Sequence, residues 1–310
     1  MKPIAVVGSS NTDMIVELDR IPAPGETLLG RRFFMAHGGK GANQAVAAAK
    51  AGGRVAFLCR IGSDSFGDQA LAQFKKHGIL TAGVIRDRQS PSGVALIFVG
   101  AGGENSIAVA SGANARLAPA DVWKHRRLIQ SSAALVLQLE TPIETVEAAA
   151  GIAYAHGIPV ILNPAPARRL PARLLKKIAV LTPNETEAAT LTGIPIRTAR
   201  DAKAAADALR GMGVGTVIVT LGAKGALLAS AAGTRHIPGF KVKAVDTTAA
   251  GDTFNGALAV ALAEGKEMAD AVVFANAAAA LSVTKPGAQP SLPSRSEIVR
   301  FLKRRATPHA

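Results

Sequence analysis

The 310-residue chain has one cysteine, few aromatic residues and no long apolar run. The single cysteine, Cys59, excludes an internal disulfide and a thiolate metal cluster. Aromatic residues make up only 4% of the chain, so its core has to be built from aliphatic side chains. No stretch approaches the roughly 18 consecutive apolar residues of a membrane span, and the first residues carry no signal-peptide pattern. We therefore expect a cytoplasmic protein with no membrane partner.

Acidic residues are also scarce, because 22 Asp and Glu face 36 Lys and Arg, a formal net charge of +14. Such a balance suits anionic ligands and raises the question of nucleic acid. The basic residues are scattered, however, and cluster only in short stretches such as 124–127 and 303–305. Aromatic side chains for base stacking are few. We expect no nucleic-acid partner.

Short apolar strands alternate with amphipathic helices along most of the chain. This βα order predicts a mostly parallel sheet flanked by helices. A hairpin at 225–238 follows the last of these strands. The predicted strands are 4–9, 55–61, 134–139, 159–162, 180–181 and 216–220, and the predicted helices are 46–51, 64–77, 120–130, 143–156, 185–191, 199–212 and 268–284.

Two separated segments have a different, alternating pattern. Residues 14–18 and 27–29 flank a Pro- and Gly-containing turn, and residues 94–99 and 106–110 flank a glycine-rich turn. They predict a small second sheet. Because its strands come from two insertions, about 14–36 and 93–110, we expect a lid on a single domain spanning 1–310.

A glycine-rich stretch, 37–45, leads into a helix. It is not a P-loop, because Gly41 rather than Ser or Thr follows Lys40. It is not a dinucleotide fingerprint either, because Gln44 stands at the position of the third glycine. Glycines allow close backbone approach to a ligand, and Lys40 and Asn43 offer donors. The alternative interpretation is a simple tight turn.

A second glycine-containing helix start lies at 246–256. Asp246 and Asp252 bracket a run of small residues, and an alanine-rich apolar helix follows. Small residues at a helix start leave the first N–H groups open to a phosphate. An aspartate just inside the turn would lie within reach of the group to which, or from which, the phosphate is transferred. By itself the stretch is also compatible with an ordinary capped helix.

Polar side chains follow several predicted strands, and ligands of open α/β sheets bind at the carboxyl ends of the strands. Phosphoryl transfer needs anion-binding N–H groups, a metal ion and a base directed at the acceptor hydroxyl. Asp252 is the natural base, and the N–H groups of 249–252 would stabilise charge on the transferring group. The polar residues at strand ends and loops are Asn11, Asp13, Asn43, Glu140, Asn184 and Asp252.

Three motifs together resemble the signatures of the ribokinase-like (PfkB-type) carbohydrate kinases. They are the stretches 38–43 and 246–252 and the element Asn184-x-x-Glu187, and the likeness runs from about residue 4 to 302. The resemblance implies a three-layer α/β/α sandwich with a mostly parallel central sheet and a small β-sheet lid. It also implies ATP-dependent phosphorylation of a sugar.

The resemblance assigns roles to residues at matching positions. Asp252 would be the base, and Ala249, Ala250 and Gly251 would complete the anion hole. Ala249 stands where the wider family more often has Gly. The acceptor set would be Asn11, Asp13, Gly39, Lys40, Asn43, Glu140 and Asp252. The nucleotide set would be Asn184, Thr220, Leu221, Gly222, Ala223, Lys224, Gly225, Gly251 and Asn276.

Two ions are implied besides ATP as co-substrate. Asn184 and Glu187 would organise Mg²⁺, through water, since Mg²⁺ keeps several waters. A K⁺ ion would be held mostly by backbone carbonyls, which order the loop beside the anion hole. For Ser282, Lys285 and Ser291 an ordinary loop is the alternative. The implied K⁺ set is Asp246, Thr248, Ser282, Lys285, Gly287 and Ser291.

The implied reaction is transfer to the 5-hydroxyl of D-ribose. Deoxyribose, another sugar or a nucleoside are alternative acceptors. A non-catalytic sugar-binding regulator is a more distant alternative, and such a protein would be expected to lose Asp252. A dinucleotide-dependent oxidoreductase would need the fingerprint that is missing here. Exposed sheet edges invite partners, so we also expect a homodimer through the lid.

Overall fold

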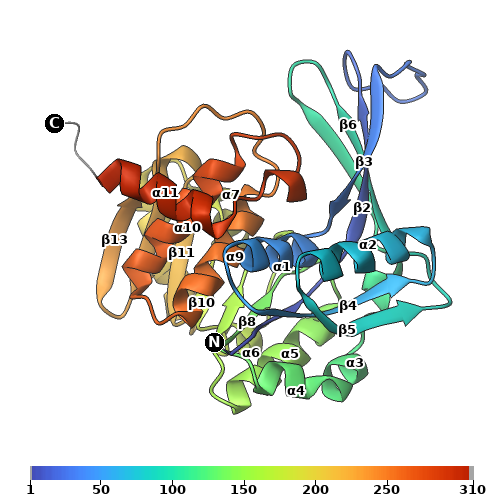
Figure 1. The fold of residues 1–310 in the computed structure, drawn as a ribbon. Helices are drawn as coiled ribbons and strands as arrows, with labels where there is room; N and C mark the ends of the chain where they lie inside the picture. The colour runs from blue at the N-terminus through green and yellow to red at the C-terminus, as the bar shows by residue number, and fades with distance from the viewer. Residues whose placement is uncertain (1, 307–310) are drawn as a thin grey trace.

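The computed structural model describes residues 2–306; Met1 and residues 307–310, which the sequence analysis includes in its single unit, lie outside the described residues. A nine-stranded sheet runs through the body in the order β13-β12-β11-β10-β9-β8-β1-β4-β5 (Figure 1). Neighbours from β11 to β5 are parallel, and β12 is antiparallel to both β11 and β13. Its strands are β1 (Ile4–Val7), β4 (Val55–Gly62), β5 (Leu80–Asp87), β8 (Ala134–Leu137), β9 (Val160–Leu162), β10 (Val180–Leu181), β11 (Thr216–Thr220), β12 (Gly225–Ser230) and β13 (Gly233–Pro238).

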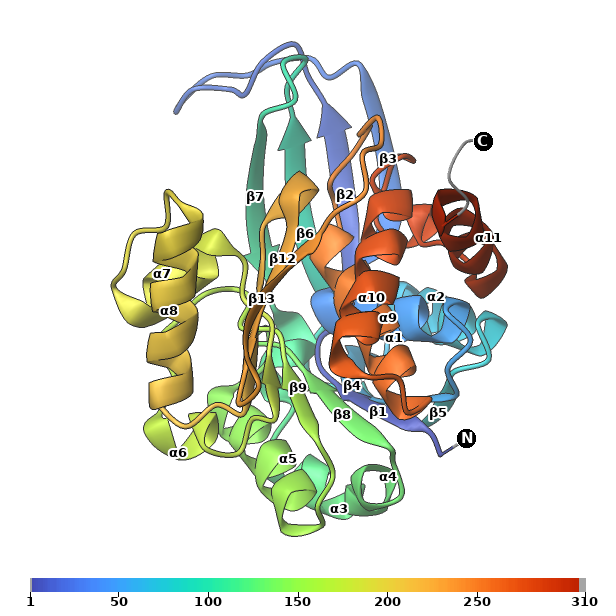
Figure 2. The ribbon, with the colours of Figure 1, turned by 90° about the vertical axis from the view of Figure 1, so that its left-hand side faces the viewer.

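Helices cover both faces of this sheet, because its central strands are apolar on both sides. β1, for example, is buried along its whole length. One face packs against α1 (Lys40–Lys50), α2 (Ser65–Lys76), α9 (Ala250–Ala263), α10 (Met268–Ser282) and α11 (Arg295–Ala306). The other packs against α3 (Pro119–Lys124), α4 (Arg126–Gln130), α5 (Ile143–Ala155), α6 (Ala172–Leu175), α7 (Glu185–Thr192) and α8 (Ala199–Gly211) (Figure 2). The three-layer α/β/α architecture expected from the sequence is confirmed.

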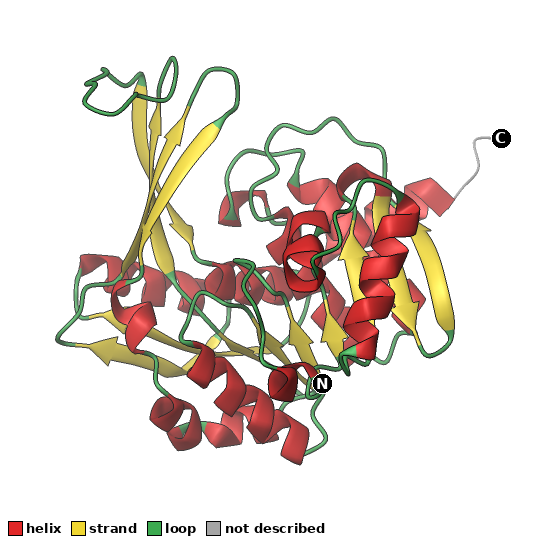
Figure 3. Ribbon diagram, turned by 180° about the vertical axis from the view of Figure 1, so that it is seen from behind, coloured by secondary structure: helices red, strands yellow, loops and turns green. Residues whose placement is uncertain are grey.

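A separate four-stranded sheet stands above the body (Figure 3). Its order is β3-β2-β6-β7, with β2 (Asn11–Glu17), β3 (Arg32–Gly38), β6 (Gly93–Val99) and β7 (Asn105–Ala110). β2 and β6 are parallel, and the outer pairs are antiparallel. Three short 3₁₀ helices complete the structure: η1 (Gly112–Arg116), η2 (Gly222–Lys224) and η3 (Gln289–Ser291).

Two local predictions were wrong, and the elements β3, β5 and α6 were not predicted. Residues 27–29 form no strand, because the chain from 18 to 31 runs as a loop in which Leu29 is 95% exposed and has no neighbouring strand. The helix predicted over 120–130 is divided into α3 and α4 at His125, whose backbone leaves the helical region. β5, an edge strand with a mixed polar and apolar sequence, was missed.

No helix among residues 2–306 is long and apolar enough to cross a membrane.

Candidate active site

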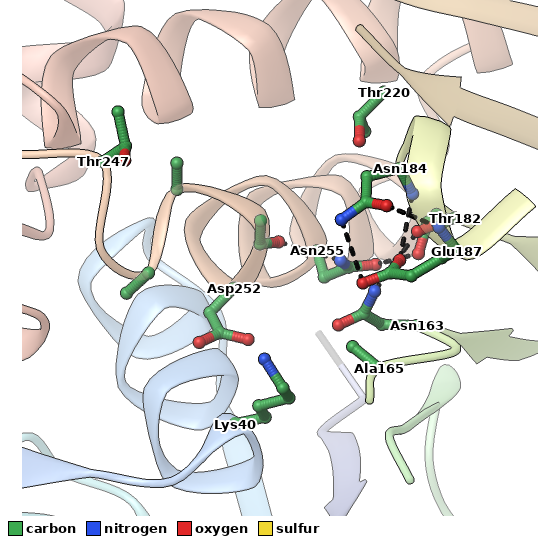
Figure 4. Close-up of a pocket in the computed structure, with 13 residues that line it drawn as sticks. Lys40, Asn163, Ala165, Thr182, Asn184, Glu187, Thr220, Thr247, Asp252 and Asn255 are labelled. Carbon is green, nitrogen blue, oxygen red and sulfur yellow. Dashed lines mark hydrogen bonds between the residues drawn. The ribbon is translucent and has the colours of Figure 1, made fainter. Parts of the chain in front are cut away.

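A polar cavity of about 210 Å³ lies where strand ends of the body meet the start of α9 (Figure 4). Such a position at the carboxyl edge of the parallel strands is where ligands bind in open α/β sheets. Residues from the two glycine-containing helix starts and from three strand ends share this one cavity. The lining residues are Lys40, Asn163, Ala165, Thr182, Asn184, Glu187, Thr220, Thr247, Ala249, Ala250, Gly251, Asp252 and Asn255.

The start of α9 opens into this cavity. Ala249 precedes the helix with φ = 59°, the left-handed region, and no side chain caps the first turn. Ala250 N donates to Thr247 O at 3.2 Å. The next N–H groups of α9, those of Gly251 and Asp252, are left for an anion, and the helix dipole favours negative charge there. Ala250 and Gly251 line the cavity beside them. The anion hole predicted from the sequence at 249–252 stays a prediction for this helix start.

Asp252 lies in the first turn of α9 and is 6% exposed. Asn43 Nδ2 donates to its Oδ2 at 3.0 Å, and Gln44 Nε2 donates to its Oδ1 at 2.9 Å. Burial raises the pKa of Asp252, while Lys40 and the two amide donors oppose that rise. In Figure 4 the ammonium group of Lys40 points toward the carboxylate. Asp252 is thus a buried acid with one neighbouring cation among the described residues.

The glycine loop brings the start of α1 against the end of β1. Gly39 has φ = +85°, and a Cβ there would lie 2.7 Å from the backbone nitrogen of Asn11. Only glycine fits that approach. At the helix start, Lys40 N donates to Glu140 Oε2 at 2.9 Å, and Ser9 Oγ donates to the same oxygen at 2.5 Å. Glu140, which follows β8, is therefore fixed beside the loop.

Asn11 and Asp13 face the same region from β2. Burial raises the pKa of Asp13 to about 7, helped by the carboxylates of Glu140 and Asp252 and opposed by Lys40. A second cavity, of about 330 Å³, is lined by Asn11 and Glu140 among others. Asn114 Nδ2 donates to Asn11 Oδ1 at 2.7 Å, which leaves the Asn11 amide hydrogens free to face a ligand. The predicted acceptor residues therefore converge.

Lys40 is the cation at the centre of this group of acids. Burial lowers the pKa of its ammonium group, but Asp252, Glu140, Glu187 and Asp13 outweigh that effect and raise the pKa above its ordinary value. Lys40 is therefore held as a positive charge between the acceptor residues and the start of α9.

A third, larger cavity of about 560 Å³ adjoins the other side of the α9 start. Phe240 and Phe254 help line it, and Thr220, Gly251 and Thr247 are shared with the polar cavity. Of the predicted nucleotide residues, Asn184, Leu221 and Lys224 do not line it: Asn184 lines the polar cavity and Leu221 packs in the core. Those that line it are Thr220, Gly222, Ala223, Gly225, Gly251 and Asn276.

The residues predicted for Mg²⁺ form a capping box at the start of α7. Asn184 N donates to Glu187 Oε2 at 2.9 Å, and Glu187 N donates to Asn184 Oδ1 at 2.7 Å. Both side chains line the polar cavity, and burial raises the pKa of Glu187. One carboxylate and one amide fit an ion that retains most of its water shell.

The residues predicted for K⁺ lie on two adjoining loops. Asp246 Oδ2 accepts from Gly287 N and its Oδ1 from Thr248 N, both at 2.8 Å. Val245 N also donates to Val283 O at 2.7 Å. The Lys285 side chain pairs with Glu297 at 2.9 Å.

The Ser282 and Ser291 hydroxyls donate to carbonyls of their own turns. Oxygen donors from two loops fit a monovalent cation.

Several residues that lie in or beside the site were not assigned from the sequence. Gln44 stands in the glycine loop and Asn163 at the end of a predicted strand, but neither position revealed its partner. Thr182 and Asn255 are joined by a 2.6 Å hydrogen bond although they are far apart in the chain. Only their positions at strand ends or in the first turns of a helix could have indicated a role. Asn114 carried no sequence signal at all.

Comparison with known proteins agrees with this geometry. Residues 1–295 match a family model described as pfkB family carbohydrate kinase. The chain is 47% identical to a ribokinase of Haemophilus influenzae over 302 residues, which cover 97% of this chain and 99% of that protein. It is 42% identical to a deoxyribokinase of Salmonella typhi over 300 residues, covering 96% and 98%.

Among solved structures, Arabidopsis thaliana ribokinase complexed with ribose and ATP has a TM-score of 0.91 with this fold. The sequences are 35% identical, and the match covers 97% of this chain and 99% of that one. A buried aspartate at an open helix start, two cavities that meet there, and likeness over nearly the whole chain lead to one conclusion: this protein belongs to the pfkB family of carbohydrate kinases.

Proposed function

We propose that this protein transfers the γ-phosphoryl group of ATP to the 5-hydroxyl of D-ribose. The observation that carries the proposal is the position of Asp252. Asp252 lies at the start of α9 and lines the polar cavity, which adjoins the 560 Å³ cavity. Its carboxylate faces the acceptor residues Asn43 and Lys40. Ribokinases with 47% and 35% identity support ribose and ATP as the substrates.

In the proposed step, Asp252 accepts the proton of the 5-hydroxyl while the oxygen of that hydroxyl attacks the γ-phosphorus. The new P–O bond forms in line with the breaking bond to the β–γ bridging oxygen, and ADP leaves with that oxygen. The N–H groups at the start of α9 stabilise the equatorial oxygens, because they are already oriented before reaction. Lys40 adds positive charge beside them.

The acceptor is held by Asn11, Asp13, Asn43 and Glu140, at the base of the four-stranded sheet. We assign this sheet, at about 14–36 and 93–110, the role of a lid that excludes water, the competing acceptor. Buried carboxylate and amide partners discriminate strongly against a sugar that lacks a hydroxyl they bind. The site therefore suits a small polyol better than an apolar acceptor.

We assign a Mg²⁺ site to Asn184 and Glu187 and a K⁺ site to the two loops joined by Asp246 and Gly287. Mg²⁺ supplies neutralising charge to the phosphates when it is bound. The two side chains of the capping box would hold its water shell, and the two loops would order the backbone just before the anion hole. Because ATP is the donor, we also propose a cytoplasmic location.

A homodimer through the four-stranded sheet is the further part of the proposal. Register places Met14, Met35 and Leu96 side by side on one face, and Phe33 beside Val16 on that face. Phe33, Met35 and Leu96 are 59%, 49% and 48% exposed. Asp13 points to the opposite face, toward the site. A second copy covering the apolar face would leave the acceptor side open.

An acceptor panel tests the proposal. ADP release is measured with ATP and D-ribose, 2-deoxy-D-ribose, other pentoses, hexoses and nucleosides, each over a concentration series. The proposal predicts the highest kcat/KM for D-ribose. A higher kcat/KM for deoxyribose would replace the substrate assignment, an outcome made specific by the 42% identity to a deoxyribokinase. No ADP release with any sugar would contradict the kinase assignment.

A further inference from the structure

Gln44 is a fully buried amide that touches Asp252 but has no place in the proposed step. Its Nε2 donates to Asp252 Oδ1 at 2.9 Å and to Asn163 Oδ1 at 3.1 Å. Its Oε1 accepts from Gln138 Nε2 at 2.7 Å. The side chain thus joins the start of α9 to the ends of β8 and β9, three elements that are distant in sequence.

The orientation of this hydrogen-bond chain follows from Asp252. An ionised carboxylate can only accept, so Gln44 has to present its NH₂ group to it. Its oxygen then faces Gln138, which must donate in turn. The remaining oxygen of Gln138 is buried and has no hydrogen-bond partner among the described residues. A buried oxygen without a hydrogen bond destabilises the folded state, so the arrangement is not the one that stability alone would favour.

The backbone leaves room for this arrangement. A Cβ at Gly8 would lie 2.0 Å from the unpaired Gln138 oxygen, so glycine at the end of β1 is what admits the amide. On the other side, Asn163 Nδ2 donates to Thr182 O at 3.2 Å, which completes the chain toward the polar cavity. Gln44 is therefore held from two sides while it holds Asp252.

The two oxygens of Asp252 differ in what holds them. Oδ2 is bound by Asn43, one of the proposed acceptor residues, whose own Oδ1 accepts from Gln289 at 3.3 Å. An arriving sugar hydroxyl can take over the place of Asn43 at Oδ2. Oδ1 is bound by Gln44, which is 0% exposed and is itself held by Gln138 at 2.7 Å, so Gln44 keeps its partner when a ligand binds.

We propose that Gln44 is a positioning residue for Asp252. It keeps Oδ1 engaged with a fixed donor, directs Oδ2 at the acceptor hydroxyl and stabilises the ionised form of the base. This inference rests on the proposed function, in which Asp252 is that base. A side chain that only filled the core would not need this hydrogen-bond network. An apolar side chain of similar size would then stabilise the core better.

The electrostatic surroundings give the proposal a measurable consequence. The charged groups that face Asp252 are Lys40 on α1, Glu140 after β8, Asp13 on β2 and Glu187 on α7. Burial raises the pKa of Asp252, and Lys40, Gln44 and Asn43 counteract the rise. Removing the Gln44 donor raises this pKa further. Because a general base works only when it is ionised, the acid limb of the rate profile then moves to higher pH.

The first experiment compares Gln44→Met with Gln138→Met by steady-state kinetics from pH 5 to 9, after circular dichroism shows that each variant is folded. Gln44→Met is expected to lose kcat by roughly ten- to a hundredfold and to shift the acid limb up by about one to two pH units, the range for a hydrogen bond to a charged group. KM for ribose and for ATP should stay within about threefold. Gln138→Met makes the same replacement at the next side chain of the hydrogen-bond network, one step further from Asp252. The acid limb of its rate profile should stay in place.

The second experiment separates this inference from the proposed function by combining Gln44→Met with Asp252→Asn. If Gln44 acts through Asp252, the double variant is as slow as Asp252→Asn alone, because interacting residues are not additive. Near-normal turnover of Asp252→Asn would overturn the assignment of the base. A slow Asp252→Asn together with a Gln44→Met variant of unchanged kcat and pH profile would overturn only the role of Gln44.

Gln44→Glu covers the case in which Gln44→Met does not fold. Glutamate keeps the size of the side chain and, when protonated, can still donate to Oδ1. The two carboxyl groups then titrate together, so the acid limb is expected to shift upward. An unchanged acid limb in Gln44→Glu would likewise overturn the proposal.

Discussion

At the scale of single residues, the site is governed by buried acids around one cation. Asp252, Asp13 and Glu187 all have raised pKa values, with burial as the largest cause, and Lys40 lowers each of them. Desolvation makes a carboxylate more basic, and a nearby ammonium keeps it ionised. Groups poised in this way are typical of catalytic sites. Two predictions belong to this scale.

Replacing Asp252 with Asn keeps the shape of the side chain but removes the base. We expect kcat to fall by at least ~10³, because proton transfer to a positioned base contributes a factor of roughly 10²–10⁴. Ribose binding, measured by isothermal calorimetry, should persist, since Asn11, Asp13 and Glu140 are untouched. Turnover within tenfold of the original protein would contradict the role of Asp252.

Asp13 should make the ligand-free protein less stable as the pH rises. Its folded pKa of about 7 lies above the ordinary 3.8, so the folded state binds the proton more tightly. This contribution to stability is fully present below the ordinary pKa and is lost as the pH rises through 7. Asp13→Asn is therefore expected to have a higher Tm than the original protein at pH 8 and a similar Tm at pH 4.5. Asp270→Asn, at an exposed position on α10, is the control and should show no such pH-dependent difference.

At the scale of elements, the two helix starts form the site by different means. α1 begins after Gly39, which admits close contact with β2, whereas α9 begins after Ala249, the one non-glycine residue with positive φ among residues 2–306. A left-handed alanine costs about 1–2 kcal/mol. The surrounding structure holds Ala249 in this turn despite the strain, and its carbonyl accepts from Thr253 N at 2.8 Å.

Ala249→Gly should relieve this strain. The gain of about 1–2 kcal/mol is reduced by the roughly 0.5–1 kcal/mol that the extra backbone freedom of glycine costs. We expect the free energy of unfolding in urea to rise by up to about 1 kcal/mol. Ala250→Gly, one residue later and inside the helix, is the matched control and should lower it by about 0.5–1 kcal/mol. Equal losses in both variants would show that Ala249 is unstrained.

The loops joined by Asp246 and Gly287 should respond to monovalent cations. Replacing a large organic cation with K⁺ at constant ionic strength is expected to raise kcat, because an ion held there orders the backbone before Ala249. The Tm should rise as well, since a ligand that binds only the folded state stabilises it. Asp246→Ala removes the acceptor of Gly287 N and Thr248 N and should abolish both responses. Identical kcat and Tm in the two salts would contradict the assignment of a monovalent-cation site to these loops.

At the scale of the whole molecule, the four-stranded sheet separates two surfaces. One face carries Asp13 toward the site, and the other carries exposed Phe33, Met35 and Leu96. Contiguous exposed apolar side chains mark interaction surfaces in soluble proteins. The same sheet would therefore cover the acceptor and join two copies.

The dimer can be tested with a double variant, Met35→Glu with Leu96→Glu. Light scattering is expected to give twice the chain mass for the original protein and one chain mass for the variant, because two buried negative charges per copy oppose association. Tyr154→Glu, at an exposed aromatic position on α5, is the control and should stay dimeric. A single chain mass for the original protein at working concentration would refute the dimer.

Most elements, and the motifs that start them, follow from local sequence. Apolar β-branched runs such as Ile4–Val7 and 216–220 have one stable environment, a buried parallel strand, and alternating βα order leaves few topologies. Glycine and small residues at 38–42 and 247–251 indicated two open helix starts, because those effects are local. The loop at 27–29 and the edge strand β5 were not predictable, since their neighbours decide whether such stretches pair.

The groups that surround Asp252, by contrast, depend on packing between distant segments. Gln44 lies 208 residues from Asp252 in sequence, and Asn163 lies 119 residues from Gln44, yet their amides meet within hydrogen-bonding distance. The pKa of Asp13, the face on which Met35 lies, and the unpaired oxygen of Gln138 likewise depend on packing between distant segments. Local sequence specifies backbone preference, but burial, register and hydrogen-bond direction exist only once distant elements are in contact.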